Sequence, residues 1–156
     1  MKKYILAFLV SMLPIIELRG GVPIAIGFGV DFIPAVVTCV LGNMLPVPFI
    51  YLFSRRFLTW GAERKYIGRY CKKLLVKGER AGQKLVKKTG RGGLFLALLL
   101  FVGIPLPGTG AWTGAMAASF LNMGFKSTVV AVGLGVILAG FIMAVGSTGV
   151  FAFIGL

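Results

Sequence analysis

An acid and a base lie two residues apart in a segment that otherwise carries no charge. Glu17 and Arg19 stand between the uncharged runs 4–16 and 20–30. A charge at the centre of a bilayer costs about 2.5–3.5 kcal/mol on insertion scales, so such residues usually face a protein interior or a water-filled cavity. The pair therefore predicts a functional site, in which Arg19 would bind a phosphate or carboxylate and Glu17 would take up and release a proton.

Glu17 has a second interpretation, as an ionised partner of Arg19 that braces a hairpin. The chain has four acidic residues and no His, so proton coupling would have to use Glu17. The same scarcity leaves few ligands for a metal or haem and little for acid–base catalysis. We therefore expect no metal, no cofactor and no enzymatic activity, and an intramembrane enzyme is disfavoured.

The charged pair lies in the first of two places where Pro and Gly interrupt apolar sequence, residues 17–21 and 104–110. Non-helical backbone at membrane depth is tolerated only where protein covers it or water reaches it. Interruptions at corresponding places in two halves of a chain indicate a transporter's central site. Helices that begin near Gly21 and near Thr109 or Gly110 would direct their positive dipole ends at that site.

The residues of the second interruption have structural as well as functional interpretations. Pro105 and Pro107 fix the backbone and remove two hydrogen-bond donors. Gly108 and Gly110 allow close approach of another backbone. Thr109 could hydrogen-bond either a ligand or a free carbonyl group.

Two further residues complete the predicted site. Trp112 could stack on a ligand or anchor the second interruption, as the tip of a hairpin, at a membrane–water interface. Asn43 could bridge helices or brace the first hairpin. We predict a substrate-binding transport site formed by Glu17, Arg19, Gly20, Gly21, Asn43, Pro105, Pro107, Gly108, Thr109, Gly110 and Trp112.

The composition and the apolar blocks predict an all-α integral membrane protein. Of the 156 residues, 58% are hydrophobic, against about 45–50% in soluble domains. Apolar blocks cover residues 4–30, 33–53, 92–121 and 127–147. The second and fourth blocks are long enough to span a bilayer as single helices, whereas the halves of the two interrupted blocks are too short to cross alone.

The order of these blocks predicts two repeats, residues 1–53 and 92–148, within a single membrane domain that covers 1–156. Each repeat has two half-helices around a break, a polar turn and a full transmembrane helix. Re-entrant hairpins would make the repeats inverted, and kinked crossings would make them parallel. The turn residues Asp31 and Lys126 favour inversion under the positive-inside rule, whereas Lys2 and Lys3 would then lie outside.

A basic loop, residues 54–91, joins the repeats. It holds every Lys and Arg except Lys2, Lys3, Arg19 and Lys126. Such loops stay in the cytoplasm, so we predict a multi-pass protein of the inner or plasma membrane. Aromatic and aliphatic residues recur at helical spacing over 57–88, which predicts an amphipathic helix against anionic headgroups; a solvated linker is the alternative.

Because the charge lies between membrane segments, nucleic acid is not an expected partner. Two full spans enclose little space, so we expect a homodimer.

Three motifs carry a resemblance to a known family. They are ELRG at 17–20 followed by Pro23, LGNMLPVP at 41–48, and IPLPGTGAWTG at 104–114. The chain resembles the small multidrug export protein family, which is similar to a distant branch of the DedA superfamily of membrane proteins with paired re-entrant hairpins. The resemblance implies an acid in the first hairpin, matched by Glu17. DedA proteins commonly carry an Arg in the second hairpin, but residues 107–112 are uncharged, so Arg19 would act alone.

Together these patterns predict a membrane transporter, coupled to protons, with its cavity between the two hairpin tips. The resemblance implies export of small molecules or translocation of an anionic lipid such as undecaprenyl phosphate. An ion or water channel would need the same interruptions without proton coupling. A non-transporting scaffold, whose basic loop binds lipid or a partner, is the other alternative.

Overall fold

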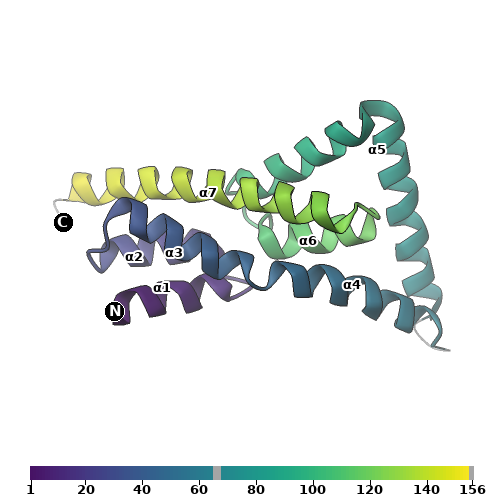
Figure 1. Cartoon of the computed structure of the whole chain (residues 1–156), viewed down its shortest axis with the longest axis horizontal. Helices are drawn as coiled ribbons and strands as arrows, with labels where there is room; N and C mark the ends of the chain where they lie inside the picture. The colour runs from purple at the N-terminus through teal and green to yellow at the C-terminus, as the bar shows by residue number, and fades with distance from the viewer. Residues whose placement is uncertain (65–67, 155–156) are drawn as a thin grey trace.

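The computed structural model describes residues 1–64 and 68–154, and every regular element in that part of the chain is an α-helix, as predicted. Two helical stretches, Phe32–Ala62 and Phe125–Val150, are long and apolar enough to cross a membrane. The helices are α1 (Lys2–Met12), α2 (Glu17–Gly27), α3 (Phe32–Met44), α4 (Val47–Ala62), α5 (Gly68–Gly103), α6 (Ala111–Phe120) and α7 (Phe125–Ile154) (Figure 1).

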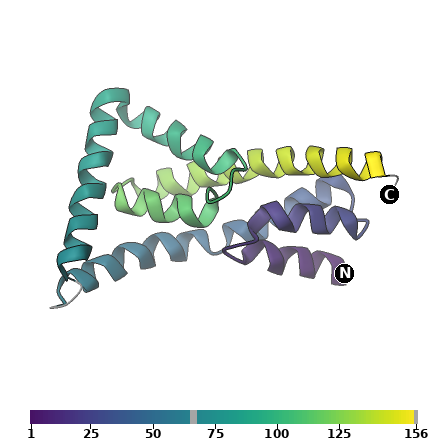
Figure 2. The same cartoon turned by 180° about the vertical axis from the view of Figure 1, so that it is seen from behind.

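The first two helices form a hairpin that enters the middle of the molecule and returns to the end where it began (Figures 1 and 2). At its open end, the Lys3 ammonium donates a hydrogen bond to the carbonyl oxygen of Phe28. Close packing depends on Gly21, because a Cβ there would lie 2.0 Å from Ser11 Oγ.

The predicted break at 17–21 is misplaced. The turn occupies residues 13–16, and Glu17 is already the first residue of α2. The cause is Pro14, because the residue before a proline avoids the helical conformation, and Leu13 is extended with ψ 134°. The predicted helix start near Gly21 is therefore wrong, and Gly20 and Gly21 serve the packing of a helix that has already begun.

A second pair of helices approaches the middle from the opposite end (Figures 1 and 2). The path of α5 bends at Gly90, which has φ 72° and ψ 177°. The part of α5 after Gly90 packs against α6, where Gly114 lies against Val102 and Leu98. Residues 104–110 join the two helices without helix, as predicted. The first part of α5 crosses the end of the molecule, where Gly78 lets it approach the Phe120 carbonyl group.

The predicted helix over 33–53 is in fact two helices, α3 and α4, separated at Leu45 and Pro46. Pro48 has no N–H to donate to the carbonyl group of Met44, which loosens the helix at this point. The two helices still follow one another as a long rod that ends at Ala62 (Figure 1). Likewise α7 extends beyond the predicted 127–147.

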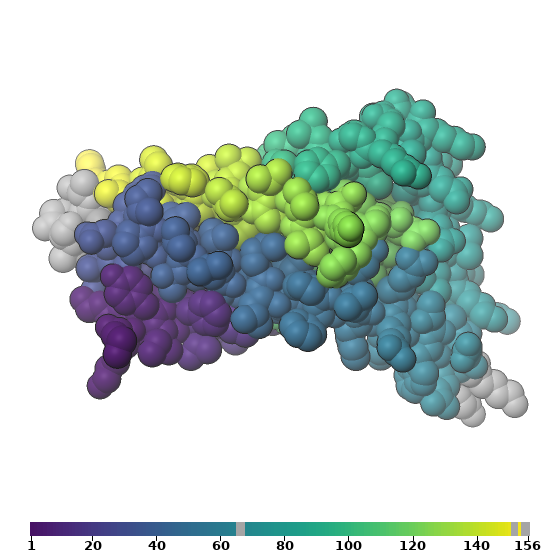
Figure 3. Space-filling view, viewed as in Figure 1, coloured from purple at the N-terminus to yellow at the C-terminus, as the bar shows by residue number. Residues whose placement is uncertain are grey.

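Residues from all seven helices contribute to one buried core. Glycines of α7 allow its neighbours to come close: a Cβ at Gly135 would lie 2.7 Å from the Leu99 carbonyl oxygen, and one at Gly140 would lie 3.1 Å from Val36 Cγ1. Large apolar side chains are exposed on the outside of α3, α4 and α7. The surfaces of these helices adjoin one another in Figure 3. An apolar exterior of this kind suits a lipid environment.

The predicted amphipathic segment 57–88 is divided between two elements. Residues 57–62 belong to α4 and 68–88 to α5, while 65–67 lie outside the described residues. On the first part of α5, Cys71 and Gly82 are buried towards the protein, whereas a basic face is exposed. This face comprises Lys72, Lys73, Lys77, Arg80 and Lys84.

Candidate functional site

The two interrupted segments meet in the middle of the molecule, and Glu17 is central to their contact. Its side chain is only 6% exposed, and Oε1 accepts a hydrogen bond from the backbone N–H of Trp112 at 3.1 Å. Glu17 also has φ 50°, a left-handed conformation that is uncommon outside glycine and persists only when the surrounding structure holds it. The first residue of α2 is thus fixed by the opposite hairpin.

The carboxylate of Glu17 lies at the N-terminus of α6. Helix N-termini have unpaired N–H groups and a partial positive charge, which a carboxylate complements. Gly110, which precedes α6, leaves the necessary space: a Cβ there would lie 1.9 Å from Glu17 Oε2. The N-terminus of α6 therefore points at the predicted site, and the anion that occupies it in this structure is Glu17 itself.

Arg19 makes a separate contact with the second hairpin. Its guanidinium group donates to the carbonyl oxygen and to the hydroxyl oxygen of Thr109. Glu17 and Arg19, both within the described part of the chain, form no ion pair with each other. Each of them binds the opposite hairpin instead, so the two charges hold the tips together rather than bracing one tip from within.

Thr109 also organises its own loop. Its hydroxyl oxygen lies 2.9 Å from the carbonyl oxygens of both Ile104 and Leu106, so its one proton is shared within the turn. Each of these carbonyls also accepts a backbone N–H, that of Leu106 at Ile104 and that of Thr109 at Leu106. The hydroxyl group thus adds to the hydrogen bonds of the turn and accepts from Arg19 at the same time.

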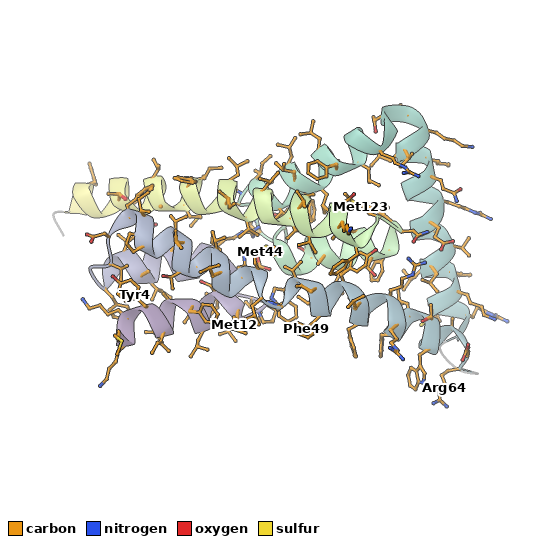
Figure 4. All side chains as sticks on the ribbon, in the orientation of Figure 1. Tyr4, Met12, Met44, Phe49, Arg64 and Met123 are labelled. Carbon is orange, nitrogen blue, oxygen red and sulfur yellow. The ribbon has the colours of Figure 1, made fainter. Side chains whose placement is uncertain are left out.

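Trp112 forms the third contact between the tips. Its indole Nε1–H donates to the carbonyl oxygen of Met12 at 3.2 Å, where α1 reaches the middle of the molecule (Figure 4). The carbonyl group at a helix C-terminus lacks an intrahelical donor, so the indole satisfies it. Sequence reasoning missed Met12, because a backbone acceptor leaves no signal in the residue type.

The remaining predicted residues have other positions. Asn43 is 2% exposed, and its Oδ1 has no hydrogen-bond partner within the described residues. Gly20 packs against Ile16. Pro105 is half-buried, while Pro107 and Gly108 lie exposed on the turn. Thus Glu17, Arg19, Thr109, Gly110 and Trp112 are brought together, and the function of this cluster stays a prediction.

Residues 17–142, which include Glu17, Arg19 and the loop 104–110 but not the turn at 13–16, match the model of a family described as "Putative small multi-drug export protein". The chain belongs to this family. No curated protein and no solved structure matches it. The family name suggests a role in membrane transport, and the two apolar helical stretches agree with a location in a membrane. The matched region begins at Glu17 itself.

Proposed function

We propose that this protein is a proton-coupled membrane transporter whose substrate passes between the two hairpin tips. The substrate would be a small exported molecule or an anionic lipid such as undecaprenyl phosphate. The single observation that supports this most is the binding of the buried Glu17 carboxylate to the Trp112 N–H of the opposite hairpin. An ionisable group in this position links its own protonation to the separation of the tips.

In this proposal the structure corresponds to a state in which the tips are closed. Where the substrate is the anionic lipid, its phosphate group competes with Glu17 for the N-terminus of α6 and binds Arg19 once it leaves Thr109. Protonation of Glu17 removes the negative charge that complements the helix dipole, so the tips separate more easily. A fixed brace would make the same contacts but would show no dependence of transport on Glu17.

We further propose that each helix pair is a re-entrant hairpin and that the two repeats are inverted. This is supported by the Lys3 contact with Phe28, which holds the two ends of the first pair together, and by the entry of the two pairs from opposite ends (Figure 1). The basic first part of α5 then lies at the cytoplasmic face. The apolar outer faces of α3 and α7 are available for a homodimer.

The test is a flux assay in proteoliposomes with an imposed pH gradient. Ethidium and a fluorescent short-chain polyprenyl phosphate serve as probes. The variants are Glu17→Gln and Arg19→Gln, and the matched controls Asp31→Asn and Lys126→Gln remove charges that lie outside the tips. We expect gradient-driven, saturable flux of one probe in the unmodified protein and in both controls.

The expected loss has a different form in each variant. Glu17→Gln should abolish the response to the gradient, and Arg19→Gln should abolish transport of the anionic probe. Unchanged flux in both tip variants would remove these residues from the proposed mechanism. Flux that rises with voltage and never saturates would indicate a channel instead.

A further inference from the structure

A cavity of about 570 Å³ lies inside the bend of α5, lined by helix on both sides of Gly90 and by the turn between α6 and α7. We call it the elbow pocket. None of the tip residues lines it. Its volume falls within the range of about 300–1,000 Å³ that is typical of small-molecule sites.

The walls of the elbow pocket are held in place from outside. Gly82 brings α5 against the turn, because a Cβ there would lie 2.3 Å from the Leu121 carbonyl oxygen. On the other side, Arg55 of α4 donates to Asn122 Oδ1, and the Tyr51 hydroxyl group donates to the carbonyl oxygen of Met123. The pocket is therefore preformed and does not need a ligand to assemble it.

One end of the pocket is cationic. Lys87 and Arg91 stand four residues apart, one on each side of the bend, and both line the cavity. Neither forms an ion pair with any residue that the structure describes. Glu79 also lines the pocket, but it precedes Lys87 by eight residues, or about 12 Å along a helix. The polar side chains of Asn122 and Ser127 face the same space from the turn and from α7.

Gln83 adds one more polar side chain, and the apolar part of the lining comes from Val86, Leu94, Leu121 and Met123. We infer that the elbow pocket binds an anionic phospholipid, with its phosphate between Lys87 and Arg91 and the start of an acyl chain against these apolar side chains. The charge attracts the headgroup, and a purely polar anion would leave the apolar lining unused. This inference does not depend on transport through the hairpin tips.

Native mass spectrometry of the full chain in detergent tests the site, by titration with phosphatidylglycerol, with phosphatidylcholine and with inorganic phosphate. The test variant is Lys87→Gln/Arg91→Gln. The matched control is Lys73→Gln/Lys77→Gln, which removes the same charge from the exposed basic face of α5. Thermal unfolding without lipid checks the fold, and the two single variants serve if the double variant does not fold.

We expect the unmodified protein to retain phosphatidylglycerol in preference to phosphatidylcholine. The elbow variant should lose about tenfold or more of this affinity, since each basic residue contributes about 1 kcal/mol near an anionic lipid. The control should change by no more than about twofold. Equal losses in the two variants, or none in either, would overturn the inference. So would inorganic phosphate that binds as tightly as the lipid, because the apolar lining would then have no role.

Discussion

The Glu17 carboxylate accepts a hydrogen bond from the backbone N–H of Trp112 at 3.1 Å, so an acid of the first hairpin caps a helix of the second. The side chain that caps the N-terminus of a helix normally comes from a residue next to that terminus. Here the cap comes from 95 residues away. Any movement that separates the tips must therefore break the cap, the Arg19 contact with Thr109 and the Trp112 contact with Met12.

Replacement of Glu17 should lower stability in proportion to the capping that is lost. Glu17→Ala removes both acceptor oxygens and should cost about 0.5–2 kcal/mol of the free energy of unfolding. Glu17→Gln keeps one acceptor oxygen and should cost less. Unfolding in detergent, followed by circular dichroism, measures both. Glu63→Ala, at an exposed position, is the control and should change stability by less than about 0.5 kcal/mol; equal effects at 17 and 63 would contradict the cap.

Gly110→Ala should disturb the tips without any change in Glu17 itself. The new Cβ would lie 1.9 Å from Glu17 Oε2 and would stand at φ 152°. Backbone strain of this kind costs about 1–3 kcal/mol. Gly92→Ala is the matched control, because nothing lies within 4 Å of its Cβ. Thermal unfolding should show a clear loss for residue 110 and none for residue 92. If both variants were as stable as the unmodified protein, the carboxylate would not occupy this space.

Arg19 and Thr109 should show energetic coupling in a double-mutant cycle. Thr109→Val removes the hydroxyl acceptor but leaves the backbone carbonyl, so Arg19 keeps part of its binding. With Arg19→Gln as the second change, we expect a coupling of about 1 kcal/mol in the free energy of unfolding. Thr113→Val supplies the control cycle, because its hydroxyl group donates to the Gly110 carbonyl oxygen rather than binding Arg19. Coupling of equal size in both cycles would argue against a direct contact.

The docking of α5 should depend on the small residues that face the turn between α6 and α7. Gly82→Leu would place side-chain atoms against the Leu121 carbonyl group, where even a Cβ comes within 2.3 Å. We expect α5 to move outward and the buried Cys71 thiol to react faster with a maleimide, in a background with Cys39→Ala. Ala81→Leu, on the exposed side of the helix, should leave the labelling rate unchanged. Equal rates in the two variants would contradict the proposed packing.

The sequence located a non-helical loop correctly where its proline and glycine residues lie in the loop itself, and misplaced it where the glycines serve helix packing. At 104–110 two prolines and two glycines mark the non-helical loop itself, so its position was predicted correctly. In the first interruption the loop ends before Glu17, and both glycines lie inside α2, where Gly20 leaves space for Ile16 and Gly21 leaves space for Ser11 of α1. A glycine needed for close packing cannot be distinguished by type from one needed for a turn.

The site shows the same limit at the level of single residues. The cost of charge in apolar sequence was enough to single out Glu17 and Arg19. Their partners could not be derived, because Glu17 binds a backbone N–H and Arg19 binds Thr109 through both backbone and side chain. A mutual ion pair was the simplest expectation for charges two residues apart. The structure instead separates them, since the left-handed φ of Glu17 directs it to α6.

The re-entrant topology proposed for the first helix pair is supported by the contact between Lys3 and the Phe28 carbonyl group, and it can be tested directly. A re-entrant hairpin places the N-terminus and the turn at Asp31 on the same side of the membrane, whereas a kinked crossing places them on opposite sides. Cysteines introduced as Lys2→Cys and Asp31→Cys, in a background without Cys39 and Cys71, should both react with an impermeant maleimide from the outside of intact cells. Lys126→Cys, at the opposite end of the molecule, should react only after the membrane is permeabilised. Labelling of residues 2 and 31 from opposite sides would exclude the re-entrant hairpin. It would also exclude the inverted repeats, and the proposed meeting of the two tips within the bilayer depends on those repeats.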